Sequence, residues 1–227
     1  SASFKLHKGE ILGFSGFIET GRTELWEGIV GLREKAGNIY VNEKKLDIHN
    51  YFDAIENEIA YLTEDRKDKA LLTDKNLITN LTLMSLYKYC DPFIDEKKEE
   101  KALDEAIKEF EIQVPDKEST VHELSGGNQQ KLALAKIMEV DPEIIIFDEP
   151  TRGIDVGTKR QIYHFIRNLA DQGKSCVVIS SELQEIIGLC NRVVVMHEGT
   201  ITGIIEDEAN INEEEIMQYA TGLKGAI

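Results

Sequence analysis

The chain has 227 residues, 41% of them hydrophobic and 30% charged, a composition that excludes a disordered tail protein. At about 150 residues per domain, this length predicts one to two compact units whose core is large enough to fold without disulfides. The formal charge of −16, from 26 Lys and Arg against 42 Asp and Glu, disfavours nucleic-acid binding, and the lack of an apolar run of about 18 residues argues against a membrane span.

The three cysteines, Cys90, Cys176 and Cys190, are odd in number and far apart in the sequence. Such spacing fits a reduced compartment better than a disulfide or zinc framework, and we expect the cytoplasm. The amino terminus has no charged leader before an apolar region and opens almost directly on the strand-like residues 4–6. We therefore expect the natural protein to begin upstream of Ser1.

The front of the chain predicts a strand, a loop and a helix. The apolar run at 11–14 predicts a buried strand, a glycine-containing loop follows it, and residues 23–32 have helical periodicity. Three further segments, at 38–41, 46–48 and 59–62, predict strands with turns between them. Together they indicate a mixed, partly antiparallel front section.

The apolar spacing becomes helical from about Asp74 to Val114, with a break at Asp91-Pro92. The charge run from Asp95 to Lys101 is most simply a solvated helix face. We therefore predict a second lobe inserted into the first. The predicted boundaries are 1–73 and 120–227 for the core lobe and 74–119 for the inserted helical subdomain.

The second half of the chain alternates helices and strands. Helices are predicted at 128–140 and around Ile162 to Leu169, and strands at 144–147 and 175–180. Strands that alternate with helices imply a parallel sheet.

The carboxyl-terminal part predicts a hairpin and a helix. The apolar segments 193–196 and 200–205 flank Glu198-Gly199, which is a hairpin signal. The acidic tail from Asp207 predicts a surface helix.

Residues 16–23 match the spacing of a phosphate-binding loop, with two glycines separated by four residues, then a cation and a hydroxyl. The loop N–H groups and the start of the following helix can cradle phosphate, and the Thr23 hydroxyl can bind Mg²⁺. Taken alone, so loose a match is a chance turn roughly half the time. The candidate nucleotide-binding residues here are Gly16, Phe17, Ile18, Glu19, Thr20, Gly21, Arg22, Thr23 and Glu24.

Two carboxylates, Asp148 and Glu149, end the apolar strand predicted at 144–147. On a strand beside a phosphate loop, the first can reach the metal's water shell and the second the attacking water. The alternative is that they merely close a strand before the Pro150 turn. Because loop and carboxylates form two halves of one site, we favour the functional interpretation.

The segment LSGGNQQK at 124–131 adds a third element. Its Ser and two Gly expose backbone N–H groups at a helix start, which has positive dipole character and can hold the γ-phosphate of a second nucleotide. The alternative is a plain helix cap. The candidate residues here are Ser125, Gly126, Gly127 and Asn128.

In this order, the loop, LSGGNQQK, IIIFDEP, GID at 153–155 and SSE at 180–182 resemble the nucleotide-binding domain of ATP-binding-cassette (ABC) transporters over nearly the whole chain. More narrowly, the GRT loop, the EDRK segment at 64–67, LSGGNQQK and DEPTRGIDVG resemble the C-terminal cassette of tandem ATPase subunits from bacterial monosaccharide importers of the ribose, galactose and xylose kind. Relatives that serve nucleosides or autoinducer sugars share these motifs, so the substrate stays open.

The resemblance implies an α/β fold: a P-loop NTPase core with a mainly parallel sheet, an antiparallel front section and an inserted helical subdomain. It implies ATP and Mg²⁺ as cofactors and the cytoplasmic face of the cell membrane as location. Two cassettes would pack head to tail, the second being the N-terminal half of the same full-length chain. A transmembrane permease subunit would contact residues 77–87, unless that stripe is only core, and a periplasmic or surface sugar-binding protein would act indirectly.

The resemblance also assigns roles and shows four departures. The catalytic residues would be Glu149 and Ser181, and the metal set Thr23, Glu64 and Asp148. The departures from the family pattern are Arg22 for the loop Lys, Glu19 for a mid-loop Gly, Glu64 for a Gln and Ser181 for the switch His.

These departures predict weak nucleotide binding and poor hydrolysis at this chain's own loop. A planar guanidinium does not replace a compact ammonium in a tight phosphate nest, and Glu19 adds a carboxylate near the phosphates. The adenine-stacking aromatic expected upstream of the first strand is also absent from the sequence. By contrast, the intact Ser125 to Gly127 should complete the partner cassette's site.

Two functions of different classes follow. One is an ATPase domain that couples ATP binding and hydrolysis to sugar import, favoured by the retained Glu149. The other is a non-catalytic interaction module, favoured by Arg22, Glu19 and Ser181. A soluble cassette acting in translation or DNA repair is weaker, because of the −16 charge and the importer-like NQQK and TRGIDVG segments.

Overall fold

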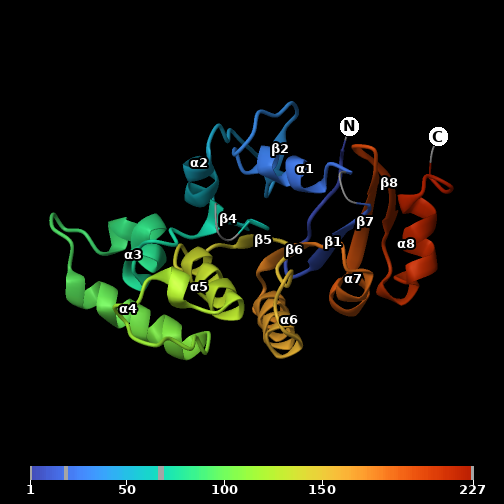
Figure 1. The fold of residues 1–227 in the computed structure, drawn as a ribbon. Coiled ribbons are helices and arrows are strands. Elements are labelled where there is room, and N and C mark those ends of the chain that lie inside the picture. Colours follow the sequence, from blue (N-terminus) through green and yellow to red (C-terminus); the bar gives the residue numbers. More distant parts are fainter. Residues whose placement is uncertain (1, 18–19, 66–68, 226–227) are drawn as a thin grey trace.

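Strand β1 (Ile11–Ser15) lies inside a six-stranded sheet in the part of the chain that the computed structural model describes, residues 2–17, 20–65 and 69–225. The predictions on Ile18, Glu19, Arg66 and Lys67 lie outside the described residues. The strand order is β4-β5-β6-β1-β7-β8 (Figure 1). The other strands are β4 (Ile59–Leu62), β5 (Ile144–Asp148), β6 (Ser175–Ile179), β7 (Arg192–His197) and β8 (Thr200–Ile205).

Neighbouring strands from β4 to β7 pair in parallel, and β8 pairs antiparallel with β7. Every residue of β1 and β6 is buried, as expected for parallel strands that are covered on both faces. Phe14 lies opposite Ile179, and Phe147 lies opposite Val178. The prediction of a mainly parallel sheet with a carboxyl-terminal hairpin is confirmed.

A separate two-stranded antiparallel sheet, β2 (Ile39–Val41) with β3 (Lys44–Leu46), forms the front hairpin. Asn42 and Glu43 both have positive φ, 49° and 65°, as a two-residue hairpin turn requires. The antiparallel front section is therefore confirmed, but the strand predicted at 46–48 is shifted. The turn makes Val41 pair with Lys44, so β3 begins at two exposed lysines that hydropathy does not mark as a strand.

Helices lie on both sides of the large sheet. Figure 1 shows α1 and α2 on one side and α5, α6 and α7 on the other, with α8 beside β7 and β8. The α-helices are α1 (Arg22–Ile29), α2 (Tyr51–Glu56), α3 (Leu77–Thr82), α4 (Glu96–Glu109), α5 (Gly126–Met138), α6 (Val156–Asp171), α7 (Leu183–Leu189) and α8 (Glu213–Ala220). Three 3-10 helices are η2 (Leu83–Lys88), η3 (Val121–Glu123) and η4 (Glu208–Asn210) among the described residues.

The inserted segment is helical as predicted, and α3 and α4 lie at the end of the molecule beyond α5 (Figure 1). Leu77, Leu81 and Leu103 are fully buried. They belong to the same hydrophobic cluster as Leu132 of α5 and the α5-facing side of the sheet. The helical lobe is therefore packed on the core through α5, while its boundaries at 74 and 119 remain a prediction.

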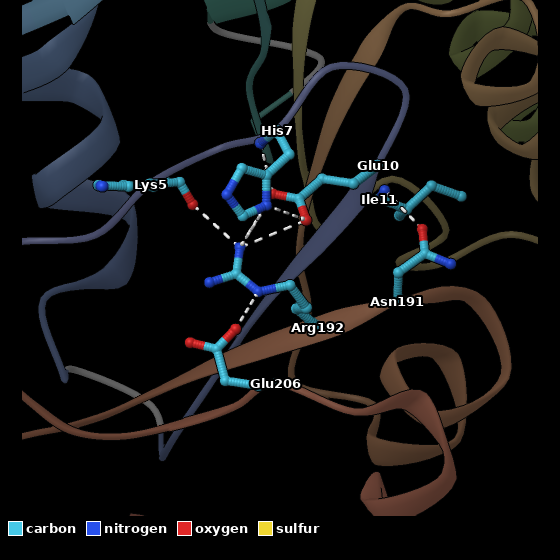
Figure 2. A network of polar contacts seen from close by, with 7 residues as sticks. All are labelled: Lys5, His7, Glu10, Ile11, Asn191, Arg192 and Glu206. Atoms are coloured by element: carbon cyan, nitrogen blue, oxygen red, sulfur yellow. Dashed lines mark hydrogen bonds and ion pairs between the residues drawn. The ribbon is translucent and has the colours of Figure 1, made fainter.

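A polar network binds the amino-terminal segment to the sheet at the amino-terminal ends of β1 and β7 (Figure 2). Arg192, at the start of β7, donates to the Lys5 carbonyl and to Glu10 Oε1, both at 3.1 Å. Its Nε donates to Glu206 just after β8, and His7 Nδ1 lies 3.3 Å from Glu10 Oε2. Because the predicted phosphate-binding loop follows the carboxyl end of β1, the network and the loop lie at opposite ends of that strand.

The acidic tail ends in α8, whose Ile216 and Ala220 are buried against the β7-β8 side of the sheet. The predicted surface helix is thus present, with one buried face. Within residues 2–17, 20–65 and 69–225, helices are all too short or too polar to cross a membrane.

Candidate functional site

The loop between β1 and α1 depends on two glycines. Gly16 has a φ of 151°, and a Cβ there would lie 2.4 Å from the Met196 carbonyl oxygen. Gly21, the N-cap of α1, has a φ of 85°. The Thr20 carbonyl accepts a hydrogen bond from Gly199 N at 3.0 Å. The described part of the loop is thus braced by the β7-β8 hairpin, a contact that sequence reasoning missed.

Arg22 is buried at the first position of α1 and is held by protein groups. Its Nη1 donates to the Ser180 carbonyl at 2.6 Å, and its Nη2 lies 4.0 Å from Glu149 Oε1. Burial lowers the pKa of Arg22, and the nearby Glu149 and Asp148 carboxylates oppose that shift. The guanidinium therefore joins the end of β5 to the end of β6.

Asp148 is fully buried at the end of β5. The Tyr61 hydroxyl donates to its Oδ2 at 2.6 Å. Its Oδ1 makes no hydrogen bond of acceptable geometry among the described residues, although the Thr23 hydroxyl is near enough to lower the pKa of this carboxyl. Burial is the larger effect and raises the pKa of Asp148 above its ordinary value.

These surroundings fit a magnesium ion. A buried carboxylate oxygen without a hydrogen bond, next to a threonine hydroxyl, offers the hard oxygen ligands that Mg²⁺ prefers. In the described ranges there is no cluster of three or more His, Cys, Asp or Glu side chains that could hold a metal. Mg²⁺ commonly uses one or two protein ligands together with phosphate oxygens, so such a cluster is not required.

Glu149 and Ser181 are brought together, as the resemblance implied. The Ser181 hydroxyl donates to Glu149 Oε2 at 3.1 Å. Burial raises the pKa of Glu149, and the hydrogen bond from Ser181 and the charge of Arg22 partly offset this rise. Glu149 itself has a positive φ of 48°, and its N–H donates to the Ile179 carbonyl at 2.8 Å. The predicted catalytic pair therefore lies beside Arg22, at the ends of β5 and β6.

Glu64 is engaged elsewhere. It follows β4 and forms an ion pair with Arg152, in the turn after β5. Sequence reasoning missed this partner, although the two residues have opposite charge and follow neighbouring parallel strands. The assignment of Glu64 to the metal set remains a prediction.

The LSGG segment forms the start of α5, two residues earlier than the helix predicted at 128–140. Ser125 is the N-cap, and its Oγ accepts from Asn128 Nδ2 at 3.0 Å. The Asn128 carbonyl oxygen Oδ1 accepts from Gln113 N at 2.9 Å. These residues face a polar cavity of about 380 Å³ whose lining is Glu111, Gln113, Ser125, Gly127, Asn128, Lys131, Asp155, Gly157, Thr158 and Gln161.

The loop and the LSGG segment have different neighbours. Loop residues Thr20 and Arg22 contact the β7-β8 turn and the ends of β5 and β6. Gly127 instead lies against Thr158 at the start of α6, where a Cβ would be 3.0 Å from the Thr158 hydroxyl. The chain thus carries two distinct polar regions, each with part of the predicted site.

A second, mostly apolar cavity of about 320 Å³ lies between β4, α5 and η2. Its lining is Leu32, Tyr51, Tyr61, Leu62, Thr63, Lys69, Ala70, Met84, Ala133, Lys136 and Ile137. Residues 77–87, which are predicted to contact a membrane subunit, are partly buried and partly exposed. Leu77 and Leu81 are core, Met84 lines the cavity, and Leu83 and Tyr87 are 48% and 67% exposed.

Known proteins match this chain in sequence. The family model described as "ABC transporter" matches residues 1–152. A putative ribose/galactose/methyl galactoside import ATP-binding protein of Halalkalibacterium halodurans is 45% identical over 97% of this chain and 42% of its own length. A ribose import ATP-binding protein of Clostridium perfringens is 46% identical over 98% of this chain and 45% of its own length. The chain spans less than half the length of these curated relatives.

Solved structures match the fold. A dimeric ATP-binding cassette in a post-hydrolysis state with ADP and phosphate has a TM-score of 0.76 at 21% identity, over 88% of this chain and 87% of its own. The ADP form of a cassette from an ABC transporter has a TM-score of 0.75 at 21% identity, over 97% of this chain and 87% of its own. These likenesses establish the α/β P-loop cassette fold. With two thirds of its residues covered by the family model, the chain belongs to the ABC transporter family.

Proposed function

We propose that this chain is the nucleotide-binding domain of a ribose/galactose-type importer and couples the binding and hydrolysis of Mg-ATP to sugar uptake. The observation that carries the proposal is the position of the buried Asp148 and of Glu149 at the end of β5, where Glu149 lies beside Arg22 at the start of α1. The names of the relatives support a sugar substrate, and a nucleoside importer is the alternative that the shared motifs allow.

ATP would lie on residues 16–24, where backbone N–H groups and the start of α1 favour phosphate. Thr23 and Asp148 would hold the magnesium ion, which neutralises phosphate charge. Glu64 would join them only after its ion pair with Arg152 opens. Glu149, whose pKa is raised by burial, would orient a water molecule and accept its proton.

This chain's own site would hydrolyse ATP poorly. Arg22 already binds the Ser180 carbonyl and lies beside Glu149, so a phosphate must compete with both. Ser181 holds the carboxylate of Glu149 on its other oxygen. Glu19, which lies outside the described residues, adds a negative charge in the loop. These contacts also favour the second candidate function, a non-catalytic module that responds to nucleotide.

The LSGG segment would serve a second cassette. Ser125 caps α5 with its hydroxyl, and the helix start faces an open polar cavity. A γ-phosphate bound by a partner's loop would meet N–H groups and a positive helix dipole there. Because the relatives are more than twice as long as this chain, we assign the partner cassette to the other half of the natural protein.

A membrane permease subunit would dock at the cavity between β4, α5 and η2. This cavity is mostly apolar and includes Lys69 and Lys136. Its lining residue Met84 belongs to η2, which also carries the exposed Leu83 and Tyr87. An amphipathic helix of the permease fits such a surface. The chain would then lie at the cytoplasmic face of the membrane, and a sugar-binding protein would act on the permease from the other side.

Calorimetric titration of this chain with ATP and Mg²⁺ tests the proposal. We expect weak binding that becomes severalfold tighter in Glu19→Gly, because that change removes a carboxylate near the phosphates. Glu43→Gly, in the exposed β2-β3 turn, is the matched control and should leave affinity unchanged.

Two outcomes of this titration would contradict the proposal. Low-micromolar affinity in the unmodified chain, lost in Arg22→Ala, would mean that the loop is not impaired. No ATP binding by either the unmodified chain or Glu19→Gly would overturn the assignment as a nucleotide-binding domain.

A further inference from the structure

We infer that Tyr61 is a positioning residue for the magnesium site. Its hydroxyl holds one carboxylate oxygen of Asp148 and so keeps the second oxygen available to the metal. The inference rests on the proposed function, because Mg-ATP binding at this loop is part of that proposal.

The two residues come from neighbouring parallel strands. In β4, Tyr61 lies opposite Ile146 of β5, and Asp148 ends β5 two residues later. Both side chains are buried, with 5% of Tyr61 and none of Asp148 exposed. Their oxygen atoms are 2.6 Å apart, which is typical of a hydroxyl that donates to a charged carboxylate.

The hydrogen bond is selective for one oxygen. Oδ2 receives the Tyr61 proton, whereas Oδ1 is equally buried and makes no hydrogen bond of acceptable geometry among the described residues. Leaving a buried carboxylate oxygen unsatisfied is unfavourable unless a ligand binds it. Rotation of the carboxylate would break the Tyr61 bond, so this bond fixes which carboxylate oxygen stays available to a metal beside Thr23.

Tyr61 is itself held in place by contacts to its backbone and near its hydroxyl. Tyr61 N donates to the Tyr51 hydroxyl at 3.0 Å, and that hydroxyl donates to the Tyr61 carbonyl at 3.3 Å. The Thr63 side chain lies near enough to the Tyr61 hydroxyl to lower the pKa of that phenol, although burial is the larger effect and raises it. The phenol therefore has little freedom to leave Asp148.

Replacing Tyr61 with phenylalanine removes the hydroxyl and keeps the ring, so it tests the hydroxyl alone. The Tyr61 ring packs in the cluster that contains Phe14, Trp26 and Ile146, and phenylalanine keeps that packing. Tyr61→Phe thus removes one donor to Asp148 and little else. Tyr89→Phe is a matched control, because Tyr89 is also buried and donates to a carboxylate, that of Glu139, away from this site.

The test measures how metal and nucleotide binding depend on each other. ATP is titrated into the chain in EDTA and at increasing Mg²⁺, and Mn²⁺ electron paramagnetic resonance with ATP reports the metal directly. We expect Tyr61→Phe to raise the Mg²⁺ concentration at half-maximal ATP binding about tenfold, the size of one hydrogen bond to a charged group. Affinity in EDTA should not change, and Tyr89→Phe should behave as the unmodified chain.

The inference is overturned if Tyr61→Phe keeps the unmodified Mg²⁺ midpoint and Mn²⁺ spectrum. It is also overturned if ATP affinity falls equally with and without metal, since that result indicates a general structural role. If the unmodified chain binds ATP without any metal dependence, the magnesium site of the proposed function fails, and that failure is visible before any variant is compared.

Discussion

The Ser181 hydroxyl donates to Glu149 Oε2 at 3.1 Å, while Arg22 Nη2 lies 4.0 Å from Oε1 of the same carboxylate. Both oxygens of the proposed general base therefore face a protein group. For Glu149 to activate a water molecule, at least one of these two contacts must weaken.

We expect Ser181→Ala to raise the pKa of Glu149. Burial already raises this pKa, and the Ser181 hydrogen bond lowers it, so removing the hydroxyl leaves the burial effect less opposed. Carboxyl ¹³C NMR titration measures the change, with Ser125→Ala as a control that removes a hydroxyl from the other polar region. An unchanged or lower pKa in Ser181→Ala would show that this hydrogen bond does not stabilise the ionised carboxylate.

If the proposed function holds, Ser125→Arg should lower the ATPase rate of the full-length natural protein, assembled with the proposed permease, by at least about tenfold. An arginine at the N-cap of α5 removes the capping hydroxyl and fills the polar cavity before the helix start. Ser3→Arg, at an exposed position near the amino terminus, is the control. Equal ATPase rates in the two variants would show that the LSGG segment takes no part in the partner cassette's site.

We expect Glu185→Gln to stabilise the fold at neutral pH and to have less effect in acid. Glu185 is buried in α7, and burial raises its pKa above the ordinary value. The folded state therefore holds a proton that the unfolded state releases, so stability falls as the pH rises from about 4.5 through the raised pKa.

Urea unfolding at pH 4 and pH 8 checks this prediction. The gain in unfolding free energy for Glu185→Gln should be about 1 kcal/mol larger at the higher pH. Glu56→Gln, at an exposed position in α2, should show no such difference. The explanation fails if the difference in unfolding free energy between Glu185→Gln and the unmodified chain is the same at pH 4 and pH 8.

We expect Arg192→Met to destabilise the fold by about 3 kcal/mol, because it leaves the buried Glu10 carboxylate without its cation. The side chains of Arg192 and Glu10 are 11% and 9% exposed, and they meet through two hydrogen bonds (Figure 2). Adding Glu10→Gln should restore part of the loss, which a double-mutant cycle in urea measures. Strictly additive losses would mean that the two residues do not interact energetically.

The sequence predicts most of the framework, because buried parallel strands are short apolar runs that stand out from helical periodicity. Ile144 to Phe147 and Ser175 to Ile179 are found in this way, and both are strands. The hairpin strand at Lys44 is missed by two residues, since its exposed lysines give no apolar signal. The approximate helical segment between Asp74 and Val114 is likewise predicted from spacing.

The candidate site is predicted only where its residues are contiguous. The loop and the Asp148-Glu149 pair are each visible as motifs. The Tyr61 bond to Asp148 joins residues 87 apart in the chain and depends on β4 lying next to β5. A buried tyrosine in an apolar strand signals the need for a partner, but strand order, which decides the partner, is a property of the whole sheet.

The pairing of β1 has a consequence for the order in which the protein is assembled. The strand that leads into the candidate phosphate-binding loop is synthesised more than 150 residues before its two neighbours in the sheet, β6 and β7. Arg22 likewise reaches the Ser180 carbonyl across 158 residues. The strand before the loop therefore lacks both of its sheet partners until β6 and β7 have been synthesised, and a nascent chain that ends before β6 also lacks the Ser180 carbonyl that Arg22 contacts.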